Sequence, residues 1–332
     1  MKALLSKSPG GPHTLVLEEV PEPMAGPGEV RIAVRACGVN YPDLLIIQDL
    51  YQVKPPRPFS PGAELAGVVD AVGEGVNNVR VGDRVLVSPV RSGMAEKAVG
   101  LAGNCWKIPD AMPFEEAAAL LLTYGTSQHA LKDRAQLQPG ETLLVLGAAG
   151  GVGLAAIELG KAMGARIVAA ASSPEKLALA QECGADIGVQ YPTGPLDKAQ
   201  ARDLTNRFKA ACGPDGAQVI YDGVGGDYTE AALRAIGWQG RHLVVGFTAG
   251  VPKLPLNLAL LKSCQIVGVF WGEFTSRYPA LHAANVAALL ALYLDGRIKP
   301  VVTERFPLAR GAEAIARLGD RKARGKVVVV ID

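Results

Sequence analysis

The sequence predicts an α/β protein with two domains, a β-rich N-terminal domain and a doubly wound parallel sheet. The chain has 332 residues, which is long for one hydrophobic core. Residues 1 to about 120 contain short apolar runs rich in Val, Gly and Pro. From Glu141 to about residue 250, strand-like and helix-like segments alternate at the spacing of βαβ units. This alternation is typical of a parallel sheet with helices on both faces.

The N-terminal part reads as a small β barrel or sandwich. Its strand-like runs include Val30–Ala36, Gly67–Val72 and Asp83–Val87. Turn signals separate these runs, at Pro27-Gly28, Pro61-Gly62 and Gly73–Gly75. Gly and Pro at such regular intervals are typical of all-β domains. Helix signals replace this pattern around Pro113–Ala119.

The parallel sheet is expected to contain six strands, with further elements after it. The six are Leu143–Leu146, Arg166–Ala170, Ile187–Gln190, Gln218–Tyr221, Arg241–Val245 and Gln265–Phe270. Beyond them, Pro279–Asp295 reads as an amphipathic helix and Val327–Ile331 as a closing strand. We expect the chain to return to the first domain from about residue 271. The predicted domains are therefore 1–122 with 271–332, and 123–270.

The most informative segment is a glycine-rich turn between a strand and a helix. Thr142–Leu146 is apolar, residues 147–153 hold four glycines, and Leu154–Leu159 reads as a helix. A dinucleotide site needs this order, because glycine lets the backbone approach a pyrophosphate at a helix N-terminus. Tight strand-to-helix turns also use glycine for steric reasons alone.

The end of the next strand indicates which dinucleotide binds. NAD sites usually place Asp or Glu about 20 residues after the glycines. Here Ala171 and Ser172 stand at that point, followed by Ser173 and Lys176. Hydroxyls and a cation suit a 2′-phosphate, so this pattern favours NADP over NAD. Ser172 could instead cap the helix that opens at Pro174, and both roles are compatible.

Composition excludes several other classes of protein. The net charge is +2, and no basic stripe interleaved with aromatic residues suggests a nucleic-acid partner. No apolar run approaches the roughly 20 residues of a membrane helix, and the N-terminus lacks a signal-peptide core. The five cysteines are scattered, without a disulfide framework or metal spacing, which favours the cytoplasm. They are Cys37, Cys105, Cys183, Cys212 and Cys264.

Several segments together resemble the medium-chain dehydrogenases/reductases, and in particular their zinc-free NADPH:quinone oxidoreductases, the zeta-crystallin-like group. They are Cys37–Asp43, Pro61–Val69, Gly82–Val85, Ala148–Gly153 and Gly325–Val328. The resemblance covers nearly the whole chain. It implies a GroES-like barrel, a Rossmann domain, and a cofactor in the cleft between them.

The resemblance also bears on zinc. Zinc alcohol dehydrogenases of this superfamily have Cys at the position of Asn40 and His at that of Ala63, and only Glu64 persists. A catalytic zinc needs about three protein ligands, so we expect no metal and a structural hydrogen bond or ion pair for Glu64. The structural-zinc lobe is missing as well, since Cys105 is the only cysteine between Ser88 and Lys107.

The resemblance implies roles for named residues. Tyr41 and Tyr51 would contact or orient the substrate, and Tyr51 would stand on a loop bordering the acceptor pocket. Relatives often have Gly where this chain has Asp49, which puts the size of the substrate in doubt. The cofactor-binding residues would be Asn40, Asp43, Thr123, Ala149, Gly150, Gly151, Val152, Ser172, Lys176, Tyr191, Gly246, Phe247, Phe270, Trp271, Gly272 and Lys326. Lys326 would reach the cofactor phosphates, and Tyr191 would contact the 2′-phosphate together with Lys176.

The function that the resemblance implies is zinc-independent hydride transfer from NADPH to a quinone or a related conjugated carbonyl. One alternative is an enoyl or alkenal reductase, with acrylyl-CoA as a candidate substrate. Another is a non-catalytic NADPH-binding protein with a structural or regulatory role. Relatives usually form homodimers through edge strands of the Rossmann sheet, here Ser263–Phe270. We expect the four histidines to be surface residues, and Asp222 to cap a turn.

Overall fold

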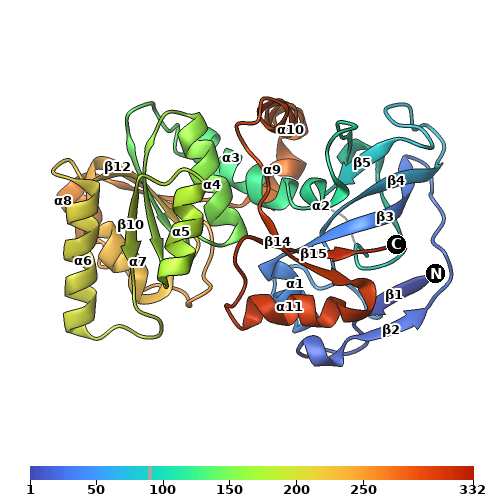
Figure 1. Ribbon diagram of the computed structural model, residues 1–332, viewed down its shortest axis with the longest axis horizontal. Coiled ribbons are helices and arrows are strands. Elements are labelled where there is room, and N and C mark those ends of the chain that lie inside the picture. The colour runs from blue at the N-terminus through green and yellow to red at the C-terminus, as the bar shows by residue number, and fades with distance from the viewer. Residues whose placement is uncertain (89–91) are drawn as a thin grey trace. The chain divides into compact units, whose positions relative to one another are not determined.

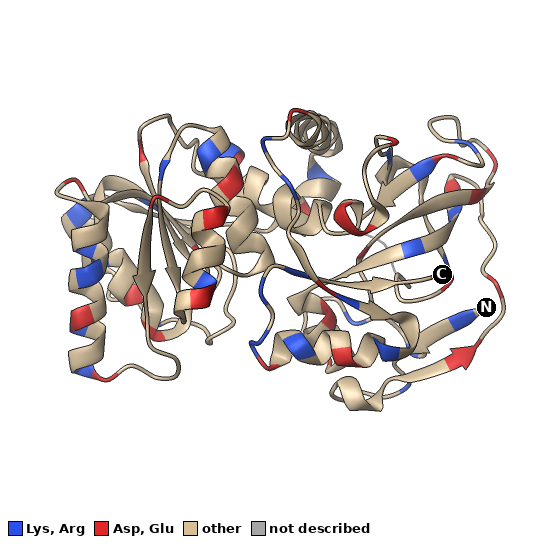
Figure 2. Ribbon diagram, in the orientation of Figure 1, with Lys and Arg blue, Asp and Glu red and all other residues tan. Residues whose placement is uncertain are grey.

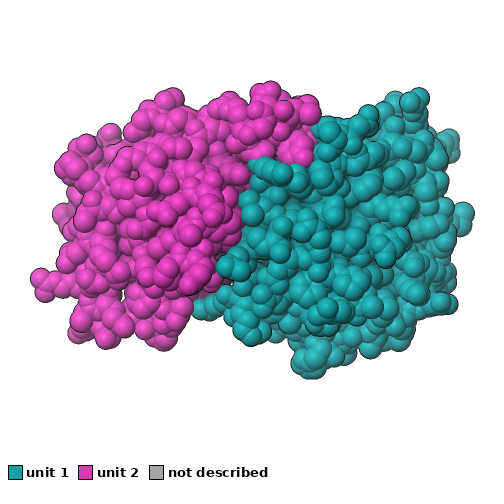
Figure 3. All heavy atoms as spheres, viewed as in Figure 1, with its two compact units in different colours: residues 1–122, 299–332 teal, residues 123–298 magenta. Residues whose placement is uncertain are grey.

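The computed structural model describes residues 1–88 and 92–332. It divides into two compact units, which Figure 3 shows in two colours. Unit 1 comprises Met1–Leu122 and Lys299–Asp332, and unit 2 comprises Thr123–Ile298. The expected domain boundaries stay a prediction; the units differ from the expected domains in that residues 271–298 fall in unit 2.

Unit 2 is built on a six-stranded parallel sheet in the order β10-β9-β8-β11-β12-β13. All six strands overlap segments expected from the sequence, but β12 begins at Ile236, well before the expected start at Arg241. Their bounds are β8 Thr142–Leu146, β9 Arg166–Ala171, β10 Ile187–Gln190, β11 Ala217–Asp222, β12 Ile236–Val244 and β13 Gln265–Gly268. The order reverses direction between β8 and β11, and such a reversal is where doubly wound sheets bind ligands.

Helices cover both faces of this sheet (Figure 1). One face packs against α4, where Gly160 lies over Leu143 and Ile167. The other face packs against α6 and α7 around the buried side chains of Leu144 and Val168. The helices of this part are α4 Gly151–Ala162, α5 Pro174–Glu182, α6 Lys198–Cys212, α7 Gly226–Leu233 and α8 Asn257–Lys262.

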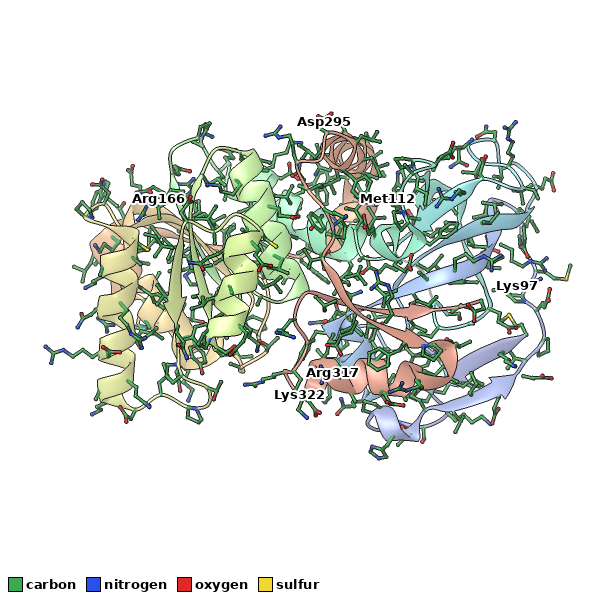
Figure 4. The ribbon with its side chains drawn as sticks, in the orientation of Figure 1. Lys97, Met112, Arg166, Asp295, Arg317 and Lys322 are labelled. Atoms are coloured by element: carbon green, nitrogen blue, oxygen red, sulfur yellow. The ribbon has the colours of Figure 1, made fainter. Side chains whose placement is uncertain are left out.

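Arg166 ties β9 to the end of α6 and is labelled in Figure 4. Its guanidinium donates to the carbonyls of Ala211, at 2.7 Å, and Cys212, at 3.2 Å. The last carbonyls of a helix lack partners within it and attract cations.

Two further helices belong to unit 2 because they pack on its first helical segments. These helices are α9 Trp271–Arg277 and α10 Pro279–Leu294, and the segments are η3 Leu121–Gly125, α3 Thr126–Gln128 and η4 His129–Arg134. Phe274 stacks on His129 with ring centroids 3.9 Å apart. Asn285 donates to Asp133 at 2.8 Å. These contacts explain why residues 271–298 lie with unit 2.

Unit 1 contains a seven-stranded sheet in the order β14-β15-β3-β4-β5-β7, with β6 paired to β3, and a separate β1–β2 pair. Only β14 and β15 run parallel. The strands are β1 Lys2–Leu5, β2 Val16–Glu19, β3 Glu29–Val39, β4 Glu64–Val72, β5 Arg84–Val87, β6 Lys97–Leu101, β7 Cys105–Lys107, β14 Val302–Pro307 and β15 Lys326–Val330. Its helices are η1 Pro12–Thr14, α1 Tyr41–Ile47, η2 Ala102–Asn104, α2 Phe114–Ala117, η5 Leu308–Arg310 and α11 Gly311–Gly319.

Charged residues of both signs are interspersed along helices such as α6 and α11 (Figure 2). Across residues 1–88 and 92–332, none of the helices combines the length and apolar character needed to cross a membrane.

Candidate functional site

The glycine-rich turn joins β8 to α4, as predicted. Gly147 adopts a left-handed conformation with φ of 66°, and its carbonyl accepts from the N–H of Gly150 at 3.0 Å. A Cβ on Gly153 would lie 2.3 Å from that same carbonyl oxygen, so only glycine fits there. No side chain caps α4, and its first turn holds no acidic residue. The first N–H groups of this helix therefore form a ready site for an anion.

A second turn, after β11, lies against the first. A Cβ on Gly147 would come within 3.0 Å of Val224. The carboxylate of Asp222 accepts from the N–H groups of Val224 and Gly225, each at 2.9 Å. The prediction that Asp222 caps this turn is therefore confirmed. The two turns meet where the strand order of the sheet reverses.

The predicted nicotinamide-ribose loop lies beside this second turn. The N–H of Gly246 donates to the carbonyl of Asp222 at 3.2 Å. Phe247 follows with its side chain about half exposed. The structure therefore brings Gly246 and Phe247 to the same edge of the sheet as the glycine-rich turn.

The predicted carboxamide segment packs on the helical segment that carries Thr123. Phe270 is exposed, Trp271 is buried and opens α9, and Gly272 follows it. A Cβ on Gly125 would lie 2.8 Å from the ring of Trp271. Thr123 is buried two residues before that contact. These two predicted cofactor segments are therefore neighbours in unit 2.

The predicted 2′-phosphate residues lie at the ends of β9 and β10. The N-cap of α5 is Ser173, which accepts from the N–H of Lys176 at 3.4 Å. The capping role considered for Ser172 thus belongs to its neighbour. The ammonium of Lys176 donates to the Ser172 hydroxyl at 3.2 Å. The ring of Tyr191 is buried against Tyr228, with centroids 4.9 Å apart.

Two residues that support the glycine-rich turn were missed by the sequence analysis. The buried Ser127 hydroxyl donates to the carbonyl of Val152 at 3.0 Å and lies 2.9 Å from the hydroxyl of Tyr221. These contacts hold the first turn of α4 in place. They join residues 25 and 94 positions apart, so no local pattern reveals them.

Unit 1 contains a buried network around an ammonium group. The Lys326 Nζ donates to Glu64 Oε1 and Asn40 Oδ1, each at 2.7 Å, and to the Val39 carbonyl at 3.2 Å. The expected structural hydrogen bond or ion pair of Glu64 is therefore confirmed, and its ion-pair partner is Lys326. Lys326 was expected to reach cofactor phosphates. The structure instead buries its side chain, only 4% exposed, and these acceptors use all three of its N–H groups.

Asn40 and Asp43 complete this network at the start of α1. The Asn40 amide donates to Glu64 Oε1 at 2.8 Å and to the Gly38 carbonyl at 3.2 Å. The Asp43 carboxylate accepts from the N–H groups of Asn40, at 2.8 Å, and Gly62, at 3.1 Å. Burial raises the pKa of Asp43 to about 6. The cofactor contacts expected of Asn40 and Asp43 stay predictions.

The two candidate substrate tyrosines lie on or just after α1. Tyr41 is its first residue, half-buried against the core of unit 1. Tyr51 is half-buried on the loop that follows the helix. Burial, and then the nearby Asp43 carboxylate, raise the pKa of the Tyr51 hydroxyl. This hydroxyl therefore stays protonated, and able to donate, at neutral pH.

The prediction that the histidines are surface residues holds for His13 and is wrong for the other three. His129 stacks on Phe274. His242 is fully buried and lies 3.3 Å from Asp222. His282 is buried with its ring edge-on to Trp271, 5.5 Å between centroids. Burial lowers the pKa of His282 to about 4, so the ring is neutral near pH 7.

The same network bears on whether a metal fits unit 1. Asn40 and Glu64 already bind the Lys326 ammonium, and the Ala63 side chain has no atom that could ligate a metal. A divalent ion there would have to displace a buried cation and would meet too few ligands. Across the described ranges, no cluster of three or more His, Cys, Asp or Glu could hold a metal ion.

Comparisons with known proteins identify the family models and relatives that this chain matches. Residues 26–129 match the model of the alcohol dehydrogenase GroES-like domain, and residues 151–286 match that of the zinc-binding dehydrogenases. Quinone oxidoreductase-like protein 2 from Bos taurus is 39% identical over 317 residues, covering 95% of this chain and 88% of the relative.

Two solved structures complexed with NADPH have the same fold. A mycobacterial protein is 31% identical with a TM-score of 0.91, covering 99% of each chain. Escherichia coli quinone oxidoreductase is 26% identical with a TM-score of 0.90, covering 99% of this chain and all of its own.

A GroES-like domain and a six-stranded parallel Rossmann-type sheet in one chain define the medium-chain dehydrogenase/reductase fold. The chain belongs to the quinone oxidoreductase-like family of that superfamily.

Proposed function

We propose that this protein is an NADPH-dependent reductase that transfers hydride to a quinone or a related conjugated carbonyl without a catalytic metal. One observation carries the choice of cofactor. Beyond the glycine-rich turn, the end of β9 presents Ser172 and Lys176, hydrogen-bonded to each other, in place of an acidic residue. A hydroxyl and a cation suit a phosphate. NADPH, when bound, would supply the hydride.

In this proposal the residues of unit 2 bind and orient the cofactor. The N-terminus of α4, with Ala149, Gly150, Gly151 and Val152, would hold the pyrophosphate through backbone N–H groups. Ser172, Lys176 and Tyr191 would lie at the 2′-phosphate. The segments with Thr123, Gly246, Phe247 and Phe270–Gly272 would position the nicotinamide end. A cofactor site between the two domains stays a prediction.

The donor set of unit 1 supports the metal-free part of the proposal. Lys326 neutralises Glu64, the residue that the resemblance matches to a zinc ligand of the alcohol dehydrogenases. Without a Lewis acid, the acceptor must delocalise the charge of the reduced product by itself. Quinones and conjugated enones do so. Tyr51 or Tyr41 would donate a hydrogen bond to the acceptor oxygen.

Steady-state rates with a panel of acceptors test this function. We expect NADPH oxidation with 1,4-benzoquinone and naphthoquinones, unaffected by chelators, with no stoichiometric zinc by elemental analysis. If enoyl substrates such as acrylyl-CoA or alkenals turn over orders of magnitude faster than the quinones, the protein is an enoyl reductase. Tight NADPH binding without turnover of any acceptor would assign the non-catalytic role.

Replacement of Lys176 by Ala is expected to weaken NADPH while leaving NADH almost unchanged. Loss of one charged contact to a phosphate costs about 1.5–3 kcal/mol, which is roughly a 10- to 150-fold rise in the NADPH KM. The measurement is the KM for both cofactors. Lys198→Ala, an exposed lysine at the start of α6, is the matched control. An equal loss for NADPH and NADH would contradict the assignment of Lys176.

We also propose a homodimer formed through β13, which ends the sheet of unit 2. An edge strand exposes unpaired backbone groups. Apolar side chains are exposed on and around it, namely Trp238, Leu256, Leu260, Leu261 and Ile266. We expect Ile266→Lys to shift the dimer toward monomer in analytical ultracentrifugation. The control is Val81→Lys, which alters an exposed apolar residue of unit 1. A parent protein that sediments as a monomer would refute the proposal.

A cytoplasmic location also stays a proposal.

A further inference from the structure

The loop after α1 begins with a strained residue. Asp49 has φ of 59°, the left-handed conformation that glycine favours at the end of a helix. Its N–H donates to the Ile46 carbonyl at 3.1 Å, which closes the last turn of α1. An aspartate in this conformation persists when its surroundings hold it there. The contacts of its side chain are therefore informative.

Arg57, at the other end of the loop, contacts the Asp49 side chain and holds it in place. Its Nη1 lies 2.9 Å from Asp49 Oδ1. Its Nη2 donates to the Ile47 carbonyl at 3.0 Å, at the C-terminus of α1, and its Nε donates to the Ser6 hydroxyl at 3.3 Å. The guanidinium also lies over the ring of Phe59 at 5.3 Å. With only 16% of its side chain exposed, Arg57 joins the base of the loop to the body of unit 1.

Residues 50–56, between these two charges, form a short closed loop that exposes apolar side chains alongside the polar Gln52 and Lys54. Leu50 is 67% exposed and Val53 is 48% exposed. Tyr51 lies between them and is half-buried. Two exposed aliphatic side chains beside an amphipathic tyrosine suit contact with a flat, apolar ring that carries an oxygen.

We propose that the Asp49–Arg57 ion pair is a clasp that determines acceptor specificity, by holding Leu50, Tyr51 and Val53 as a fixed wall that admits compact planar acceptors and excludes bulky ones. This inference rests on the proposed function, because it assigns the loop to the acceptor rather than to NADPH. Both clasp residues act through the loop and are positioning residues. Opening the clasp frees the wall to move, which lowers the discrimination between small and large acceptors.

The test compares 1,4-benzoquinone with a naphthoquinone that carries a long alkyl chain. Asp49→Gly keeps the left-handed backbone and removes the carboxylate, and Arg57→Met removes the cation at similar length. We expect both variants to shift the ratio of kcat/KM values at least five-fold toward the bulky quinone, with the KM for NADPH unchanged. The double variant should resemble either single variant, since each one opens the same clasp. Hydrogen exchange of residues 50–56 should accelerate in all three.

The matched control is Arg321→Gly, which relieves another non-glycine residue of unit 1 with positive φ, 55°. This variant should keep the parent's ratio. If the parent is active and both clasp variants keep that ratio, the clasp proposal is overturned and the proposed function stands. A parent that turns over no acceptor overturns the proposed function, and the clasp with it.

Discussion

Replacement of Lys326 by Met is expected to destabilise unit 1 by about 3–5 kcal/mol, because it leaves Glu64 buried without its counter-ion. The two side chains are 4% and 2% exposed and lie 2.7 Å apart. The Asn40 side chain accepts from Lys326 and donates to Glu64. Its oxygen would therefore lose the hydrogen bond that Lys326 donates. Urea denaturation of the full-length protein, followed by circular dichroism, measures the effect.

A double-mutant cycle separates the ion pair from the loss of packing. Lys326→Met combined with Glu64→Gln removes both charges, and we expect it to cost clearly less than the sum of the single changes. Lys322→Met is the matched control, since this lysine, labelled in Figure 4, forms an ion pair with Asp320 in which both side chains are more than half exposed. It should change stability by less than about 0.5 kcal/mol. Additive costs in the cycle would contradict a direct coupling between Lys326 and Glu64.

Replacement of Gly153 by Ala is expected to weaken NADPH binding roughly 10- to 100-fold, equivalent to about 1.4–2.7 kcal/mol. The added Cβ would lie 2.3 Å from the Gly147 carbonyl oxygen and 2.9 Å from backbone atoms of Ala148. Backbone atoms cannot turn aside as a flexible side chain can. The first turn of α4 must therefore shift away from the turn that precedes it. Fluorescence titration with NADPH measures the loss.

Two further glycines sharpen this experiment. Gly150 has φ of −81°, and a Cβ there would make an ordinary contact of 3.4 Å with the Gly147 carbonyl oxygen. Gly150→Ala should therefore keep the melting temperature and still weaken NADPH, because its methyl group occupies the approach to the proposed pyrophosphate. Gly103→Ala, with open space around its Cβ, should change neither quantity. Unchanged NADPH affinity in both Gly153→Ala and Gly150→Ala would place the dinucleotide elsewhere.

Apolar runs between turn signals predicted the strands of unit 2, and the central strands β8 and β9 are buried and continuously apolar. Leu143–Leu146 and Ile187–Gln190 match β8 and β10 within one residue. The division of the units at residue 298 depends on α9 and α10 packing on η4, through pairs such as Phe274 and His129. Neither residue carries a local signal of that contact.

The burial of the histidines likewise could not be predicted from local sequence. A dispersed histidine reads as a surface residue, yet His242 is buried beside Asp222, and His129 beside Asp133 and Phe274. Burial of a polar ring is affordable only where such a partner is present. Asp133 is only four positions from His129, but Asp222 is 20 positions from His242, and Phe274 comes from a different helix than His129.

The sequence alone determined the elements, the glycine-rich turn and the residue types at the end of β9, since these depend on local periodicity and on the need for glycine in a tight turn. It also indicated that Glu64 forms a structural hydrogen bond or an ion pair. Only the tertiary structure identified Lys326, 262 positions away, as the partner, and joined Asp49 to Arg57. A buried charge is stable only beside its counter-charge, and folding decides which distant residues can meet.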